Sequence, residues 1–115
     1  MEVNRRKAIQ IELEDKEYIL GFFTRKDVKI AEKKGLRVSK IEDELFTQTD
    51  KLFYAGLLAK QPSITEAEAE AIIEKFINEG GDLQEVVGFL VKQIMGFMTS
   101  QTGKSKKKIV KQIEL

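Results

Sequence analysis

The stretch LFYAGLLAKQPSITEAEAEAII, residues 52–73, decides how the helices of this chain are arranged. Pro62 is the only proline in the chain, and it disfavours helical geometry at the residue before it. Thr65 and Glu68 have the spacing of a capping box, in which each side chain bonds to the backbone N–H of the other residue. Ile64 stands at the outer position of a hydrophobic staple. The stretch therefore predicts one helix that ends before Pro62 and a second that begins after Thr65.

Toward the N-terminus, residues 8–24 have the pattern of a β-hairpin with one buried face. Apolar residues alternate with polar ones in two successive runs, which is the period of a half-buried strand. Two strands alone are marginally stable in water, so helices are expected to cover the apolar side. The residues that share this face are Ile9, Ile11, Leu13, Tyr18, Leu20 and Phe22.

Between the hairpin and the proline the sequence predicts two helices. Thr24 is placed to cap the first helix, and Gly35 is placed to end it in a left-handed conformation. Ser39 and Glu42 have capping-box spacing, so the second helix is expected to begin there, with a break around residues 47–49. The inward face of this second helix is expected to hold Leu45, Leu52, Phe53 and Gly56.

Beyond the opening stretch, Gly80 and Gly81 end one helix, and Asp82 with Glu85 repeats the capping-box spacing before the next. Apolar residues cover about half of the circumference of that last helix. Such a face most often belongs to the core, but this one is wider than a single neighbour covers, and exposed apolar area marks interaction sites. Both interpretations stay open. The candidate surface for a client or a second copy consists of Val86, Phe89, Leu90, Val91, Ile94, Phe97 and Met98.

The chain changes character at its C-terminal end. Residues 99–115 carry five lysines and one glutamate, a composition that predicts a basic, mobile tail. Lysines can contact phosphates without sequence preference, but no aromatic residue for base stacking and no arginine for bidentate base readout accompanies them. A nucleic-acid contact is therefore the weaker alternative to a solvated or partner-binding tail. The candidate basic contacts are Lys104, Lys106, Lys107, Lys108 and Lys111.

Composition limits the chemistry open to these 115 residues, whose formal net charge is +1. The chain has no cysteine and no histidine, which removes thiolate and imidazole metal ligands and the commonest catalytic base. The acidic runs at residues 42–46 and 66–70 coincide with expected helix starts, where carboxylates compensate the helix dipole. We therefore expect no enzyme, no metal and no cofactor. No signal peptide and no membrane-spanning segment is evident, which predicts a cytoplasmic protein.

Together these patterns predict an α+β, mainly α fold, in which an N-terminal β-hairpin packs on a small bundle of about four to five helices. Residues 1–98 are expected to form a single globular domain, with the hairpin at about 8–24 and the helices at about 25–98. The tail 99–115 follows this domain. A chain of this size buries roughly 65% of the surface that its unfolded form exposes, so the core is modest.

The order of these elements and two of their motifs resemble the tail assembly chaperones of long-tailed bacteriophages. In that family an N-terminal hairpin is followed by helices, a Leu-Tyr-Ala-Gly-Leu-like segment, a Pro-Ser-Leu-Thr-Glu-like helix start and a final apolar helix. The resemblance covers about residues 9–98. The first motif corresponds to Leu52, Tyr54, Ala55, Gly56 and Leu57, and the second to Pro62, Ser63, Ile64, Thr65 and Glu66.

The resemblance implies a non-enzymatic assembly factor that binds the tape measure protein, keeps it soluble and helps recruit tail tube subunits. It also implies a homo-oligomer in the cytoplasm of the infected host, absent from the mature virion. The tail tube protein would be reached through a longer form made by ribosomal frameshifting, and adenine-rich codons for residues 106–108 would permit such a slip. One feature departs from a simple frameshift remnant, because apolar residues that suit a closing helix or strand follow the lysines: Ile109, Val110, Ile113 and Leu115.

A function of another class stands as the alternative. A small nucleic-acid-binding regulatory protein would use the lysine-rich tail, and its affinity would fall steeply with salt. Deletion of residues 104–115 would abolish that binding. Nucleic acid is nevertheless not the expected partner, and neither is a membrane.

Overall fold

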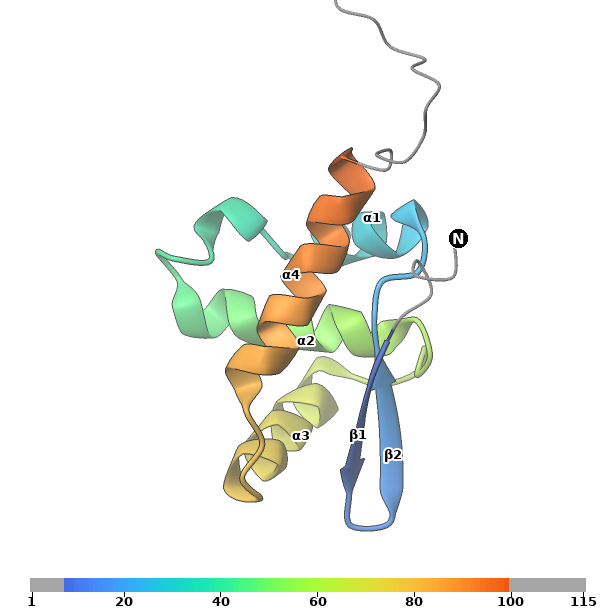
Figure 1. The fold of residues 1–115 in the computed structure, drawn as a ribbon, viewed down its shortest axis with the longest axis vertical. Coiled ribbons are helices and arrows are strands. Elements are labelled where there is room, and N and C mark those ends of the chain that lie inside the picture. The colour runs from blue at the N-terminus through green and yellow to red at the C-terminus, as the bar shows by residue number, and fades with distance from the viewer. Residues whose placement is uncertain (1–7, 100–115) are drawn as a thin grey trace, which may run out of the picture.

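The computed structural model describes residues 8–99, and its elements run from a β-hairpin through a short helix and a 3₁₀ turn to three longer helices (Figure 1). The fold is α+β and mainly α, with an N-terminal hairpin and four α-helices in this range, as the sequence predicts. The predicted basic tail beyond residue 99, with all five of its candidate lysines, lies outside the described residues.

Strands β1 (Ile9–Leu13) and β2 (Lys16–Leu20) pair in antiparallel register, with Ile11 opposite Tyr18. The predicted alternation is confirmed, because Ile11, Leu13 and Leu20 are buried. Glu14 makes the tight turn between the strands with a φ of 55°, an uncommon conformation for a residue other than glycine. The hairpin therefore turns its apolar face toward the helices.

Three sets of polar contacts join β2 and the residues after it to the helices, and one of them runs from the Phe22 N–H to Oε1 of Gln93 at 2.8 Å. The Gly21 N–H donates to the Gly56 carbonyl oxygen at 2.9 Å. The Gln61 side chain accepts from the Ile19 N–H at 2.9 Å and donates to the Ile19 carbonyl oxygen at 3.0 Å. The hairpin is thus attached both to helix α2 (Leu45–Leu58) and to the segment that follows it.

Helix α1 (Arg25–Lys33) has both ends fixed by local hydrogen bonds. The Thr24 hydroxyl accepts from the Asp27 N–H at 3.3 Å, and the Asp27 carboxylate accepts from the Thr24 N–H at 3.1 Å. At the other end Gly35 has a φ of 105°, and the Leu36 N–H donates to the Ala31 carbonyl oxygen at 3.0 Å, as in a Schellman motif. Both predicted ends of this helix are confirmed.

The prediction that the second helix begins at Ser39 is wrong. A 3₁₀ helix, η2 (Val38–Lys40), and turn residues 41–44 come first, and α2 begins at Leu45 without a break at residues 47–49. The Arg37 N–H donates to Oε1 of Gln48 at 2.7 Å. A continuous helix would hold these two residues about 16 Å apart, because each residue adds 1.5 Å. The long-range hydrogen bond therefore requires the chain to fold back before α2.

The predicted corner after α2 is confirmed. Helix α3 (Glu66–Asn78) follows the Pro62 segment, and the Thr65 hydroxyl accepts from the Glu68 N–H at 3.1 Å while the Glu68 carboxylate accepts from the Thr65 N–H at 3.0 Å. Gly80, with a φ of 91°, ends α3. Helix α4 (Leu83–Thr99) then crosses α2 (Figure 1), and the Asp82 carboxylate accepts from the Glu85 N–H at 3.3 Å.

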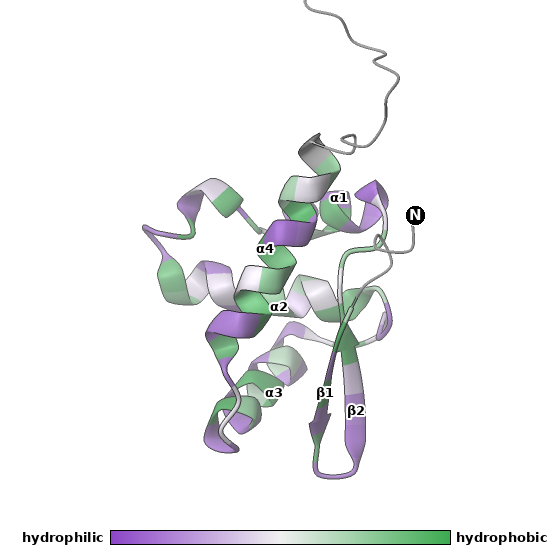
Figure 2. Cartoon of the chain, viewed as in Figure 1, coloured by the Kyte–Doolittle hydropathy of each residue, from purple (hydrophilic) through white to green (hydrophobic). Residues whose placement is uncertain are grey.

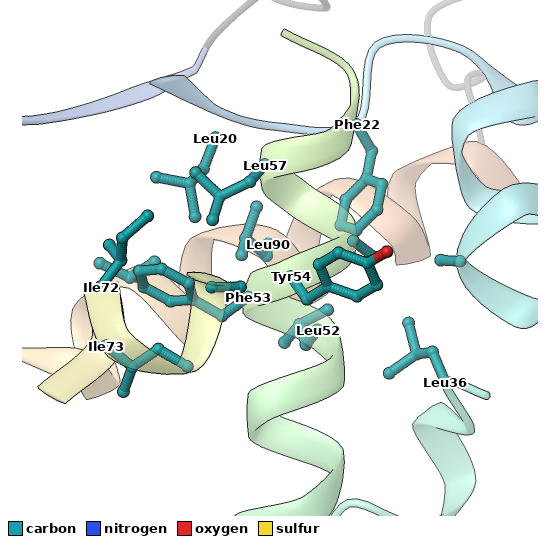
Figure 3. Close-up of a cluster of buried hydrophobic side chains, with 14 of the residues drawn as sticks. Leu20, Phe22, Leu36, Leu52, Phe53, Tyr54, Leu57, Ile72, Ile73 and Leu90 are labelled. Atoms are coloured by element: carbon teal, nitrogen blue, oxygen red, sulfur yellow. The ribbon is translucent and has the colours of Figure 1, made fainter. Parts of the chain in front are cut away.

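The core is built around the C-terminal half of α2 (Figure 3). This helix contacts α1, η2, α3, α4 and β2, and Leu52, Phe53 and Leu57 have no exposed surface. Gly56 allows the close approach of two neighbours: a Cβ added there would lie 3.1 Å from Cδ1 of Leu90 on α4 and 3.6 Å from Cβ of Leu20 on β2. The hairpin and the last helix therefore meet on the side of α2 where Gly56, which has no side chain, leaves room for both.

Candidate functional site

Helix α4 turns the centre of its apolar arc into the core. Val86, Leu90 and Ile94 follow one another at four-residue intervals, and only 2, 0 and 6% of their surfaces are exposed. They pack in the same cluster as the buried residues of α2 and the hairpin. In the folded chain these three members of the candidate surface serve the core.

The other members of the candidate surface lie beside this line. Phe89, Val91 and Phe97 are half-buried against the core, and the side chain of Met98 lies outside the described residues. Met95, next along the helix, is 48% exposed. Val87, Val91 and Met95 recur at four-residue intervals on one side of α4, and we call these three residues the α4 flank. Within this flank Met95 is exposed, while Val87 and Val91 are half-buried against the core.

The side of α4 opposite the core is open. A Cβ added at Gly88 or Gly96 would meet no atom within 4 Å, and Lys92 between them is exposed. Figure 2 shows hydrophobic and hydrophilic bands alternating along α4. The uncovered side of α4 thus lies next to the α4 flank. Gly88, Lys92 and Gly96 on this side are matched positions for control substitutions.

The first turn of α2 exposes two large apolar side chains that the sequence analysis did not place at the surface. Leu45 was expected on the inward face but is 54% exposed, and Phe46 is 83% exposed. The hydrophobic colour at the beginning of α2 in Figure 2 marks this turn. The only available signal was the seven-residue spacing between Phe46 and Phe53, which aligns the two along the helix and suggests core rather than surface.

Four carboxylates gather where α2 meets α3, and we call Asp50, Glu66, Glu70 and Glu74 the acidic patch. Partial burial, and after it the nearby charges of Glu70, Glu74 and Glu66, raise the pKa of Asp50 above its ordinary value, while Lys51 opposes the shift. Lys51 also forms an ion pair with Glu66 at 3.2 Å. The α3 carboxylates therefore do more than compensate the helix dipole, because they create a local excess of negative charge.

A shallow groove of about 690 Å³ runs between the hairpin turn and α3. Leu13, Tyr18 and Ile72 contribute apolar surface to it, and an ion pair of 3.1 Å between Lys75 and Glu14 joins its two sides. Ser63 is the only serine among its lining residues, and no carboxylate or amine of the groove forms a hydrogen bond with its hydroxyl. The groove therefore combines apolar surface with charged side chains at its rim.

Two further features of the described part of the chain concern metal binding and membrane crossing. Within residues 8–99 no group of three or more acidic, histidine or cysteine residues is arranged to hold a metal ion. None of the helices in this range has the length and apolar character needed to cross a membrane. The features that remain for function are the α4 flank, the exposed first turn of α2 and the acidic patch.

The fold and these surfaces define a small, mainly helical protein with an N-terminal hairpin and partly exposed apolar helix faces. The chain belongs to the family described as Domain of unknown function (DUF5055), whose model matches residues 5–115. The match includes the lysine-rich residues beyond α4, so this segment is part of the family's domain. Comparison with curated proteins and with solved structures returns no match.

Proposed function

We propose that this protein is a tail assembly chaperone of a long-tailed bacteriophage. It binds the tape measure protein without catalysing a reaction, keeps it soluble and helps recruit tail tube subunits, through a longer frameshifted form where one is made. It acts as a homo-oligomer in the cytoplasm of the infected host and leaves the finished virion.

The observation that carries this proposal is the position of the two motifs that resemble the chaperone family. Leu52, Tyr54 and Leu57 of the first motif are buried in the half of α2 on which the other elements pack. Thr65, from the second motif, forms the N-cap of α3. Both motifs thus act as the framework of the fold, and a shared framework supports a shared architecture more strongly than two isolated matches do.

The α4 flank, with Phe89 and Phe97 beside it, is the surface that we assign to the client. A tape measure protein is long and largely helical, and an amphipathic helix binds by laying apolar residues three and four apart on an apolar surface. Val87, Val91 and Met95 offer such a row. Burial of Val86, Leu90 and Ile94 beneath it holds the helix in place, while Val87 and Val91 keep part of their surface and Met95 is 48% exposed.

Co-expression with the tape measure protein encoded nearby tests the function. The client should shift from the insoluble to the soluble fraction when this protein is present and should co-purify with it. An equal amount of insoluble client with and without the protein would refute the proposed function.

A pair of substitutions on α4 tests the surface. Met95→Glu should reduce client capture or self-association, because it introduces a charge into the apolar flank. Gly96→Glu introduces the same charge one residue away, where a side chain meets open space, and should leave capture unchanged. Equal loss in both variants would show that charge on this helix, rather than the flank, disturbs binding.

Phe89→Glu and Phe97→Glu extend the same test to the half-buried phenylalanines. If these side chains contact the client, capture should fall while thermal unfolding stays cooperative. Loss of the cooperative transition would show that they belong to the core and would remove them from the proposed surface.

A further inference from the structure

A second surface, formed by α2 and α3, combines exposed apolar side chains with an excess of negative charge. Phe46 stands one turn before Asp50 on α2, and Ile77 stands one turn after Glu74 on α3. Phe46 is 83% and Ile77 is 44% exposed. We call Phe46, Asp50, Glu70, Glu74 and Ile77 the acidic–apolar face.

Within residues 8–99 the negative charge of this face is only partly balanced, by the nearby Lys51. Lys51 pairs with Glu66, but no lysine or arginine in this range forms an ion pair with Asp50, Glu70 or Glu74. Partial burial raises the pKa of Asp50, and the nearby charges of Glu70, Glu74 and Glu66 raise it further. Repulsion among carboxylates costs stability unless a cationic group approaches, so the face has the electrostatics of a binding site for a basic, apolar segment.

The chain itself contains such a segment. Residues 104–115 carry five lysines and one glutamate, and Ile109, Val110 and Ile113 recur at helical spacing within them. The family model continues through residue 115, so the segment belongs to the domain. An extended chain spans about 3.3 Å per residue, which lets residues 100–115 reach roughly 50 Å from the end of α4.

We propose that residues 104–115 dock in cis on the acidic–apolar face. Their lysines approach the carboxylates of Asp50, Glu70 and Glu74, and their isoleucine and valine side chains cover Phe46 and Ile77. The lysine-rich segment is then a closing element of the fold rather than a free nucleic-acid contact. The inference does not depend on the chaperone function, because it concerns only contacts within one chain.

A spin label on the full-length chain tests the docking directly. The chain has no cysteine, so Gln112→Cys carries a nitroxide at one position only. The amide signals of Glu70, Glu74 and Ile77 should lose intensity relative to the reduced label, whereas those of Lys26 in α1, a helix that lies apart from α3 (Figure 1), should not. Intact Lys26 signals together with full-intensity α3 signals would overturn the proposal.

Charge reversal separates docking from chance proximity. Glu70→Lys with Glu74→Lys should abolish the intensity loss, and adding Lys107→Glu with Lys108→Glu should restore it. Glu12→Lys with Glu17→Lys, on the exposed side of the hairpin, makes the same change in net charge and should leave the loss intact. An intensity loss that survives reversal of the α3 glutamates would contradict the electrostatic docking.

A mixture of two differently labelled chains shows whether residues 104–115 dock on their own chain or on a second copy. Isotope-labelled chains without the nitroxide are combined with unlabelled chains that carry it. Docking in cis predicts no intensity loss in the mixture. A loss in the mixture would assign the occupant to a second copy and would overturn the cis proposal.

Discussion

The two ends of α2 carry the same kind of side chain in opposite environments. Phe53 has no exposed surface and its ring centre lies 6.3 Å from that of Phe76, whereas Phe46, two turns earlier on nearly the same side, is 83% exposed. Hydropathy and helical position do not distinguish them. What differs is the reach of the other elements, because β2 and α4 converge at Gly56 and leave the first turn of α2 uncovered. Tertiary neighbours therefore decide which apolar residues of this helix become core.

The largest expected change in stability comes from replacing each of these two phenylalanines by alanine. Phe53→Ala should lower the free energy of unfolding by about 3–5 kcal/mol, because it opens a cavity in the packed half of α2. Phe46→Ala should cost no more than about 1 kcal/mol, because no element within residues 8–99 covers this side chain and a docked segment would cover it only at the surface. Urea unfolding followed by circular dichroism measures both. Similar losses in the two variants would show that Phe46 is packed as firmly as Phe53.

A comparison of two glycines sharpens the contrast between covered and open helix surface. Gly56→Val should cost about 1–3 kcal/mol, because its side chain would press on Leu90 and Leu20. Gly88→Ala on α4 should instead stabilise the protein by up to about 1 kcal/mol, since its methyl group meets open space and alanine favours the helix. The same unfolding experiment measures both changes. A destabilised Gly88→Ala variant would indicate that another surface approaches α4 there.

Removal of the N-cap of α3 tests how much this cap contributes to stability, since α3 is the helix that packs on Phe53. Thr65→Ala removes the hydroxyl that accepts from the Glu68 N–H and should cost about 1 kcal/mol. Thr47→Ala, at an exposed position inside α2, is the matched control and should be neutral or slightly stabilising. Differential scanning calorimetry should show a lower melting temperature for the first variant only.

The smallest expected effect concerns Asp50 and depends on pH. Its pKa is raised in the folded protein, so its contribution to stability is most favourable below the unfolded pKa and is lost as pH rises through the folded pKa. Asp50→Asn removes this loss and should raise the melting temperature by about 1–2 °C at pH 7, with no gain near pH 3. Glu12→Gln, on the exposed hairpin, is the control. A larger gain in the Lys107→Glu/Lys108→Glu background would agree with the proposed docking.

Prediction from the sequence succeeded where a feature depends on residues within one helical turn. The caps at Thr24 and Thr65 and the stop at Gly35 were all predictable, because donor and acceptor lie three to five positions apart. The same reasoning failed at Ser39. There the hydrogen bond between Arg37 and Gln48 joins residues eleven positions apart and imposes a turn that no local pattern reveals.

The candidate site shows the same limit. Periodicity correctly indicated that α4 is apolar over a wide arc, but it does not show how much of the arc is covered by other elements. Val86 and Leu90 proved to be core while Met95 is half exposed. The exposure of Phe46 depends on the absence of a neighbour at the beginning of α2, which hydropathy alone cannot reveal. The tail lysines lie outside the described residues, and their role stays a prediction.

The hydrogen bonds of Gln61 have a consequence for how this small sheet meets other proteins. A two-stranded sheet has two edges at which a further strand can add, and such edges invite aggregation. Because the Gln61 amide occupies both backbone groups of Ile19, it imitates one residue of a third strand and blocks strand addition at the centre of β2. The residue before the proline of the helical corner therefore also protects the hairpin, and any strand that joins this sheet is directed to the β1 edge.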